Sequence, residues 1–294
     1  MHISKIFSQA NKPVISFEIF PPKRKPNQSQ ADLNSLLRTI DQLANLKPDF
    51  ISVTYGAGGT SSEGSLEVSE YVKQKGVIPL PHFTAIGYPV EDIHAYIHQL
   101  WEKGFKNVLA LRGDLPPSPS KADLVWKDFL HATDLIKIIT RDYPDMCIGG
   151  AAYPETHQES VYEGQDIDIM KMKEQLGVEF FLTQLFFDND IFFRFMDQAR
   201  NKGVTAPVSA GVMPLTSPKF IDKIIELSGA HIPEELAEII NRWRDNEEEF
   251  KKRTLDYAVR QINDLCTRGA EGIHLYTMNR WTTAKNILKE AKIH

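Results

Sequence analysis

The sequence predicts an α/β protein built as one closed barrel, with extra helices before the last strand. Eight short β-rich runs are spread along the 294 residues, and segments with helical spacing separate them. Strands that alternate with helices indicate βαβ units and a parallel sheet. Eight such units without a linker indicate a single (β/α)8 TIM barrel over residues 1–294. A doubly wound open sheet is the alternative, but no GxGxxG motif follows the first run.

The eight runs are rich in apolar, β-branched and aromatic residues, as strands are. In chain order they are VISFEIF (14–20), FISVTYG (50–56), IPLPHFTAI (78–86), NVLALRGD (107–114), CIGGAAYP (147–154), FFLTQLFF (180–187), APVSAGVM (206–213) and EGIHLYTM (271–278). Segments such as ADLNSLLRTIDQLANL (31–46) and VEDIHAYIHQLWEKG (90–104) carry the helical spacing between them.

The seventh unit is longer than the others. It leaves room for a helix near 217–228, a second from Pro233 to about Asp245 and a third that reaches Cys266. The charged stretch 242–253 is interpreted as a solvated helix face or a helix junction, with a binding patch as the less favoured alternative.

Composition and charge exclude several classes of protein. The net charge of −5 is untypical of a nucleic-acid-binding protein. No apolar stretch is long enough to cross a membrane, and the first residues lack the pattern of a signal peptide. We therefore expect a soluble cytoplasmic protein. Cys147 and Cys266 match no zinc or CxxC spacing, so both are interpreted as structural thiols.

Glu18 is a single carboxylate inside an apolar run. In the barrel, Ile15, Phe17 and Ile19 should face the helices, and Val14, Ser16, Glu18 and Phe20 should face the interior. Active sites of such barrels lie at the carboxyl ends of the strands, where Glu18 falls. A buried carboxylate is costly unless it is paired, hydrogen-bonded or protonated. Glu18 is therefore either a paired strand-end residue or an acid held in a pocket.

Polar side chains follow most of the other strands. They are Thr54, Tyr55, His82, Thr84, Arg112, Asp114, Tyr153, His157, Gln184, Asp188, Tyr276, Asn279 and Arg280. Singly, several have structural explanations: a hydrogen-bonded core histidine, an arginine–aspartate pair in LRGD, or a tyrosine that fills the barrel. Together they are typical of an enzyme site.

The same residues argue against three chemistries. His82, His157 and a poorly placed His274 do not form a hydrolase metal set, and we expect no metal. No strand carries a Schiff-base lysine, and no GxSxG or Cys–His set is present. Isolated carboxylates, amides and aromatic rings suit a bound organic cofactor.

Eight motifs in order resemble one family, the bacterial 5,10-methylenetetrahydrofolate reductases, which are flavin-dependent barrels. They are SFEIFPPK (16–23), SVTYGAGG (52–59), PHFTAI (81–86), LALRGDLPP (109–117), AAYPETH (151–157), TQLFFD (183–188), GVMPL (211–215) and HLYTMNR (274–280). The resemblance runs from about Val14 to Arg280. It implies ping-pong hydride transfer from NADH or NADPH, through noncovalent FAD, to 5,10-methylenetetrahydrofolate.

The resemblance also implies roles for individual residues. Glu18 matches the general acid that helps open the folate ring to an iminium ion, and Asp114 matches the carboxylate that stabilises this cation and tunes the flavin. Gln184, Tyr276 and Arg280 match positions that contact the folate. The positions that match cofactor contacts are Thr54, His82, Arg112, Gly113, Asp114, Ala151, Tyr153, His157, Asp166 and Lys173.

Two positions depart from the family pattern. Ile169 and Met172 stand where an asparagine and an arginine are familiar, so the FAD phosphates must be held differently or more weakly. We expect a homo-oligomer and leave open a second subunit that delivers electrons. Two alternatives remain. One is a partner-dependent or flavin-free folate-binding subunit, and the other is a glycoside-cleaving pair formed by Glu18 and Asp114.

Overall fold

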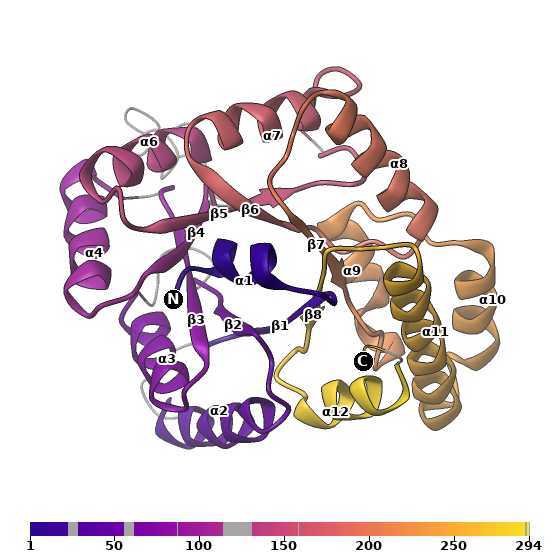
Figure 1. Cartoon of the computed structure of the whole chain (residues 1–294). Helices are drawn as coiled ribbons and strands as arrows, with labels where there is room; N and C mark the ends of the chain where they lie inside the picture. The colour runs from indigo at the N-terminus through magenta and orange to yellow at the C-terminus, as the bar shows by residue number, and fades with distance from the viewer. Residues whose placement is uncertain are drawn as a thin grey trace, which may run out of the picture.

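The computed structural model describes residues 1–22, 29–55, 62–86, 88–113, 131–157, 159–291 and 293. Eight parallel strands form a closed barrel in chain order (Figure 1). They are β1 (Val14–Ile19), β2 (Phe50–Val53), β3 (Ile78–Thr84), β4 (Asn107–Leu111), β5 (Cys147–Ala152), β6 (Val178–Thr183), β7 (Val208–Val212) and β8 (Gly272–Tyr276). The predicted barrel is confirmed. Each strand ends before the corresponding predicted run does.

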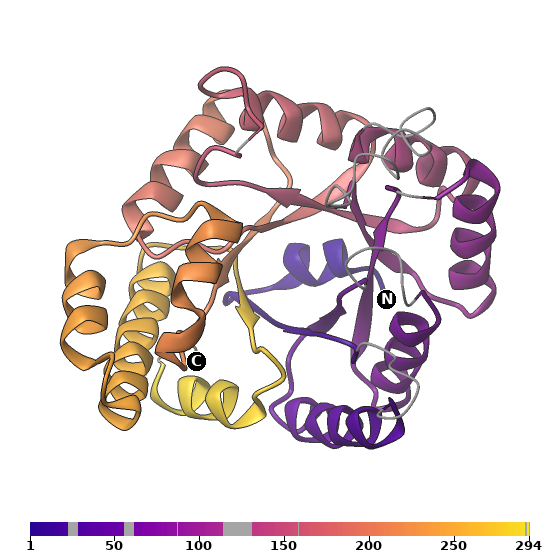
Figure 2. The same cartoon turned by 180° about the vertical axis from the view of Figure 1, so that it is seen from behind.

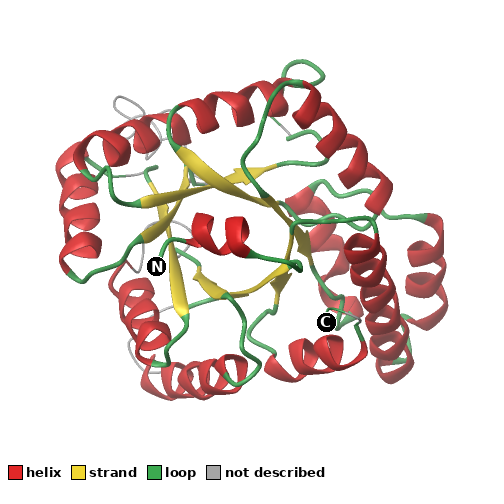
Figure 3. Ribbon diagram, viewed as in Figure 1, coloured by secondary structure: helices red, strands yellow, loops and turns green. Residues whose placement is uncertain are grey.

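Helices form a ring outside the strands, as Figure 3 shows with helices in red and strands in yellow. They are α2 (Ser29–Ala44), α3 (Ser62–Gln74), α4 (Val90–Glu102), α6 (Ala132–Asp142), α7 (Gln165–Gln175), α8 (Asn189–Asn201), α9 (Ile221–Ser228), α10 (Glu234–Trp243), α11 (Glu247–Thr267) and α12 (Trp281–Glu290), with a 3-10 turn at Pro218–Phe220. Figure 2 shows the same ring from behind.

The extra helices of the seventh unit are confirmed as α9, α10 and α11. The charged stretch 242–253 is the junction between α10 and α11, and Asn246 caps α11 by accepting from Glu249 N. Apolar residues of α9 and α10 form a second core with Leu185, Met213 and Leu215. This core lies just beyond the strand ends, so it supports the loops that would carry a site.

Side-chain alternation in β1 follows the predicted parity. Phe17 and Ile19 belong to the core between the strands and the helices, whereas Val14 packs in the barrel interior with residues such as Phe50 and Leu80. Glu18, four residues beyond Val14, therefore points inward near the carboxyl end of its strand. Its side chain is only 9% exposed.

Helix α1 (Ile3–Gln9) covers the amino-terminal end of the barrel (Figure 1). Ile3 is fully buried, and its backbone nitrogen donates to Asn107 Oδ1 at 2.8 Å. Ser4 Oγ donates to Glu179 Oε2 at 2.6 Å. The Phe7 and Phe180 rings lie 6.0 Å apart. Among the described helices, none is long and apolar enough to cross a membrane.

Candidate active site

Glu18 lies between two histidines inside the barrel. Its Oε2 atom is 3.6 Å from His82 Nε2 on β3 and 3.6 Å from His274 Nε2 on β8. Both nitrogen atoms are buried, and neither has a hydrogen-bond partner within the described part of the chain. Glu18 is thus a carboxylate in a desolvated pocket with two imidazoles just beyond hydrogen-bonding distance.

His274 was interpreted from the sequence as poorly placed, and the structure corrects this. Its side chain is in the barrel interior and fully buried. Its Nδ1 lies 2.8 Å from Ser16 Oγ, so serine, histidine and carboxylate follow one another across β1 and β8. These residues come together because Ser16 pairs with His274 and Glu18 pairs with Tyr276 in the β1–β8 register. The sequence did hold a signal for this placement. His274 stands two residues before Tyr276, which the sequence indicated as a site residue, and residues two apart in a strand point to the same face.

Burial controls the charge of His82. Desolvation lowers its pKa to about 4, although the nearby Glu18 carboxylate opposes that shift. The imidazole is therefore neutral at pH 7, and it can accept or donate one hydrogen bond without placing a second charge beside Glu18.

Tyr276 lies beside this group, with its ring centroid 5.2 Å from that of His274. Its hydroxyl donates to Thr183 O at 2.7 Å, which ties β8 to β6 across the barrel. Burial raises the pKa of Tyr276 well above its ordinary value, and the charge of Glu18 adds to this. The hydroxyl thus keeps its proton, and the ring borders the pocket of Glu18.

The end of β1 is held by the turn after β8. Thr277 Oγ1 donates to Glu18 O at 2.6 Å, and the Asn279 carboxamide bonds both the nitrogen and the oxygen of Phe20. Met278 and Asn279 adopt left-handed backbone with φ of 49° and 58°. Arg280 is the N-cap residue of α12 and follows this turn directly.

A second group of polar residues gathers where β5 meets α7. The Tyr153 and His157 rings meet edge to face, 4.7 Å apart. Asp166 Oδ2 accepts from His157 N at 3.1 Å and from Ser160 Oγ at 3.0 Å. Lys173 Nζ donates to Ala151 O at 2.9 Å. The structure therefore brings these predicted cofactor residues together.

Lys173 is a buried cation. Desolvation lowers its pKa to about 8, and the Asp166 carboxylate opposes that shift. A buried ammonium beside a carboxylate and aromatic edges suits a ligand that carries phosphate and hydroxyl groups. Ile169 and Met172 add no polar group, and Met172 is 50% exposed on α7.

Arg112 and Gly113 stand at the end of β4. Arg112 does not stand alone, since Glu159 binds its guanidinium through two contacts of 2.5 and 2.8 Å. Gly113 has a φ of 93°, and an added Cβ would lie 2.6 Å from Ile86 Cγ2. Only glycine fits this turn. Asp114 lies outside the described residues.

The remaining predicted residues lie on neighbouring strand ends. Thr54 N donates to Ile19 O at 3.0 Å, which places it beside the end of β1. Gln184 follows β6, and its Oε1 accepts from Leu185 N at 2.9 Å. Within the described residues, no group of three metal-ligating side chains is present.

Comparison with known proteins gives a consistent result. A family model described as methylenetetrahydrofolate reductase matches residues 2–292. The 5,10-methylenetetrahydrofolate reductase of Escherichia coli (strain K12) is 30% identical over 267 residues, which cover 90% of this chain and 86% of that protein. A probable methylenetetrahydrofolate reductase (NADH) of Oryza sativa subsp. japonica is 31% identical over 94% of this chain. The chain spans only 47% of the length of that plant relative.

One solved structure shares the fold. An uncharacterized protein from Clostridium thermocellum, described as binding two copies of 5-methyl-5,6,7,8-tetrahydrofolic acid, superposes with a TM-score of 0.68. The alignment covers 98% of this chain and 99% of that chain at 15% identity. At this identity, the likeness establishes the shared architecture.

Proposed function

This chain belongs to the methylenetetrahydrofolate reductase family, and we propose that it reduces 5,10-methylenetetrahydrofolate to 5-methyltetrahydrofolate. Bound noncovalently, FAD would supply the hydride chemistry between the nicotinamide donor and the folate. Plant relatives named for NADH support NADH as the donor, with NADPH as the alternative. The observation that carries the proposal is the buried Glu18 carboxyl group between two imidazoles.

Glu18 acts as the general acid in this proposal. Opening the five-membered folate ring breaks a bond between the methylene carbon and a nitrogen, and that nitrogen takes a proton as it leaves. The carbon becomes an iminium centre and then receives the hydride. An acid in a desolvated site near the substrate is suited to deliver this proton. Neutral His82 keeps a second positive charge away from the developing cation.

Other residues would bind the folate and steady the cation. The proposed contacts are Gln184, which follows β6, Tyr276 at the end of β8, and Arg280 just before α12. Asp114 is the predicted carboxylate partner of the iminium ion, and its position next to Gly113 in the sequence supports this role.

The residues on the β4, β5 and α7 side fit FAD. Asp166, Lys173, Tyr153 and His157 form a contiguous set of charged and aromatic groups. The proposed cofactor contacts are Thr54, His82, Arg112, Gly113, Asp114, Ala151, Tyr153, His157, Asp166 and Lys173. Because Ile169 and Met172 are apolar, we propose that Lys173 supplies the main positive charge on α7 for the phosphates.

A spectroscopic experiment tests this function. The purified protein is examined for flavin absorbance, and NADH is then added without oxygen. The expected result is loss of the visible absorbance, followed by its return when methylenetetrahydrofolate is added. A protein that stays colourless after FAD is supplied would contradict the proposal. That result would favour the partner-dependent or flavin-free folate-binding subunit.

Four further expectations from the sequence stay predictions. They are a single catalytic domain over residues 1–294, a cytoplasmic location, a homo-oligomeric state, and an electron-delivering subunit as the open alternative. Gel filtration of the flavin-loaded protein checks the oligomeric state, and activity with NADH alone checks the need for a second subunit.

A further inference from the structure

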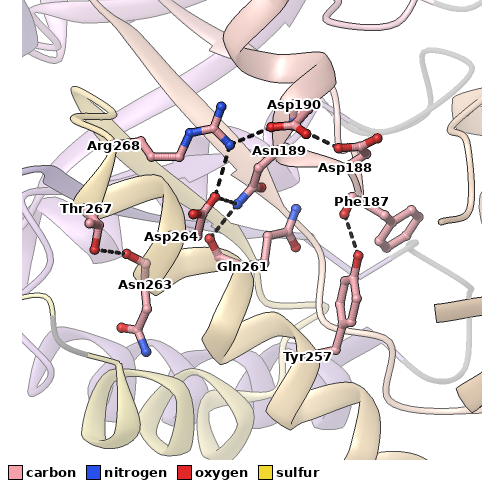
Figure 4. Close-up of polar contacts among 10 residues, drawn as sticks. All are labelled: Phe187, Asp188, Asn189, Asp190, Tyr257, Gln261, Asn263, Asp264, Thr267 and Arg268. Atoms are coloured by element: carbon pink, nitrogen blue, oxygen red, sulfur yellow. Dashed lines mark hydrogen bonds and ion pairs between the residues drawn. The ribbon is translucent and has the colours of Figure 1, made fainter. Parts of the chain in front are cut away.

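One face of α11 carries four polar side chains that contact the end of the β6–α8 connection and the first turn of α8 (Figure 4). Tyr257, Gln261, Asp264 and Arg268 follow one another at spacings of four, three and four residues, which places them on a single helix face. They meet residues 186–190. The contacts are therefore a continuous row rather than scattered surface pairs.

Two of these side chains bind backbone carbonyl groups. Gln261 Nε2 donates to Phe186 O at 2.9 Å, and Tyr257 Oη donates to Phe187 O at 2.7 Å. Phe186 and Phe187 belong to neither a strand nor a helix. The side chains of α11 thus take the place of the backbone donors that a regular element would supply.

Further along the row, the contacts anchor the start of α8. Asn189 Nδ2 donates to Gln261 O at 3.0 Å and to Asp264 Oδ2 at 2.8 Å. Arg268 binds Asp190 Oδ1 at 2.7 Å, and Asp188 Oδ1 caps α8 by accepting from Asp190 N. The path from the end of β6 to α8 is therefore held at each step.

The held segment begins directly after Gln184. Gln184 N donates to Ala152 O at 2.8 Å, and Leu185 N donates to Gln184 Oε1 at 2.9 Å. The orientation of the carboxamide therefore depends on where the backbone of Leu185 and Phe186 runs. Because Oε1 already accepts from the backbone, the two N–H groups of the amide remain as donors for a ligand with acceptor atoms.

We propose that Gln261 and Tyr257 are positioning residues for folate binding, which hold the backbone after β6 and thereby orient the Gln184 carboxamide. This inference rests on the proposed contact between Gln184 and the folate. Gln261 is suited to the task because the residue is only 7% exposed and its amide donates to a specific carbonyl. Burial raises the pKa of Tyr257 to about 12, and the charges of Glu235 and Asp188 add to this, so its hydroxyl remains a donor at neutral pH.

Two substitutions in the full-length, flavin-loaded protein test the proposal. Gln261→Leu and Tyr257→Phe remove the donors, and the latter retains the aromatic ring. Calorimetry should give a dissociation constant for 5-methyltetrahydrofolate that rises about three- to tenfold. The rate at which NADH bleaches the flavin should stay within about twofold of the parent rate, because the proposed contact of Gln184 is with the folate.

Thr267→Val is the matched control. It removes a hydroxyl donor from the same helix, but Thr267 Oγ1 binds Asn263 O and no atom of residues 186–190 among the described contacts (Figure 4). Its folate affinity should equal that of the parent protein. The positioning role would be overturned if Thr267→Val lost as much folate affinity as Gln261→Leu and Tyr257→Phe. It would also be overturned if Tyr257→Phe slowed flavin reduction by NADH as much as it weakened folate binding.

Double substitution separates this proposal from the one on which it rests. If Gln261 acts through Gln184, Gln184→Leu combined with Gln261→Leu binds folate no more weakly than Gln184→Leu alone. Unchanged affinity in Gln184→Leu would overturn the folate contact itself. If Gln184→Leu binds folate more weakly than the parent protein while Gln261→Leu and Tyr257→Phe keep the parent affinity, only the role of α11 is overturned. If Gln261→Leu does not fold, the folate affinity of Tyr257→Phe tests the proposal.

Discussion

The two ends of the barrel are closed by different means. At the amino-terminal end, α1 seals the interior with a buried isoleucine, two phenylalanine rings in tilted contact, and hydrogen bonds to Asn107 and Glu179. At the carboxyl-terminal end, Glu18 and two buried imidazole nitrogens face one another without direct hydrogen bonds. Polar groups left unpaired in a desolvated site cost stability, and such sites are where proteins perform chemistry. We interpret the first end as structural and the second as functional.

The largest expected effect is at the functional end. Glu18→Gln keeps the shape of the side chain and removes the acidic proton. We expect reduction of methylenetetrahydrofolate to fall about 10²- to 10⁴-fold, as for loss of a general acid. Stopped-flow absorbance should show that NADH still bleaches the flavin. A folate reaction that continues at the parent rate would mean that Glu18 is not the acid.

A substitution at the amino-terminal end should lower stability and leave catalysis unchanged. Ile3→Ala removes a fully buried side chain from α1, and we expect the free energy of unfolding to fall by about 2–4 kcal/mol. The turnover number measured at low temperature should be unchanged. Urea unfolding and steady-state kinetics check both expectations, and a parallel loss of turnover would erase the contrast between the ends.

Lowering the pH should reduce the stability of the protein through His82 at the functional end. The pKa of His82 is lowered to about 4 in the folded protein, so the unfolded chain binds its proton first as pH falls. The free energy of unfolding should therefore decrease between about pH 6.5 and 4, by up to about 3 kcal/mol. Urea unfolding at several pH values measures this slope, and His82→Gln should flatten it. An equal slope in both proteins would assign the effect to other groups.

The smallest expected effect is a loss of FAD affinity at high pH, through Lys173 on α7. Because the pKa of Lys173 is lowered to about 8, the free protein loses this positive charge above that pH. Affinity for FAD should then fall by up to about tenfold for each pH unit above 8, until the pKa of the bound form is reached. Fluorescence titration of the FAD-free protein measures the dissociation constant. Lys173→Met should bind FAD weakly with little dependence on pH in this range.

Much of the site could be predicted from the sequence because it follows local patterns. Alternation along β1 predicted that Glu18 points inward, and the family resemblance predicted the group of Tyr153, His157, Asp166 and Lys173. The contact of Ser16 with His274 could not be predicted in this way. It joins residues 258 positions apart, and a one-residue change of register would turn either side chain to the other face.

The row on α11 illustrates the same limit. Its spacing is visible in the sequence, but a polar stripe on a long helix is typical of a solvated face. Only the packing of α11 against the β6–α8 connection reveals that the stripe binds backbone carbonyls.

The sequence by itself determined the alternation of strands and helices, the parity of β1 and the family of the protein. These depend on residue type and short-range spacing. Closure of the barrel decided which inward-facing groups meet, since it brings β8 beside β1 and sets their register. The pocket of Glu18 is therefore a property of the closed sheet, because its three members come from strands that are distant in the chain.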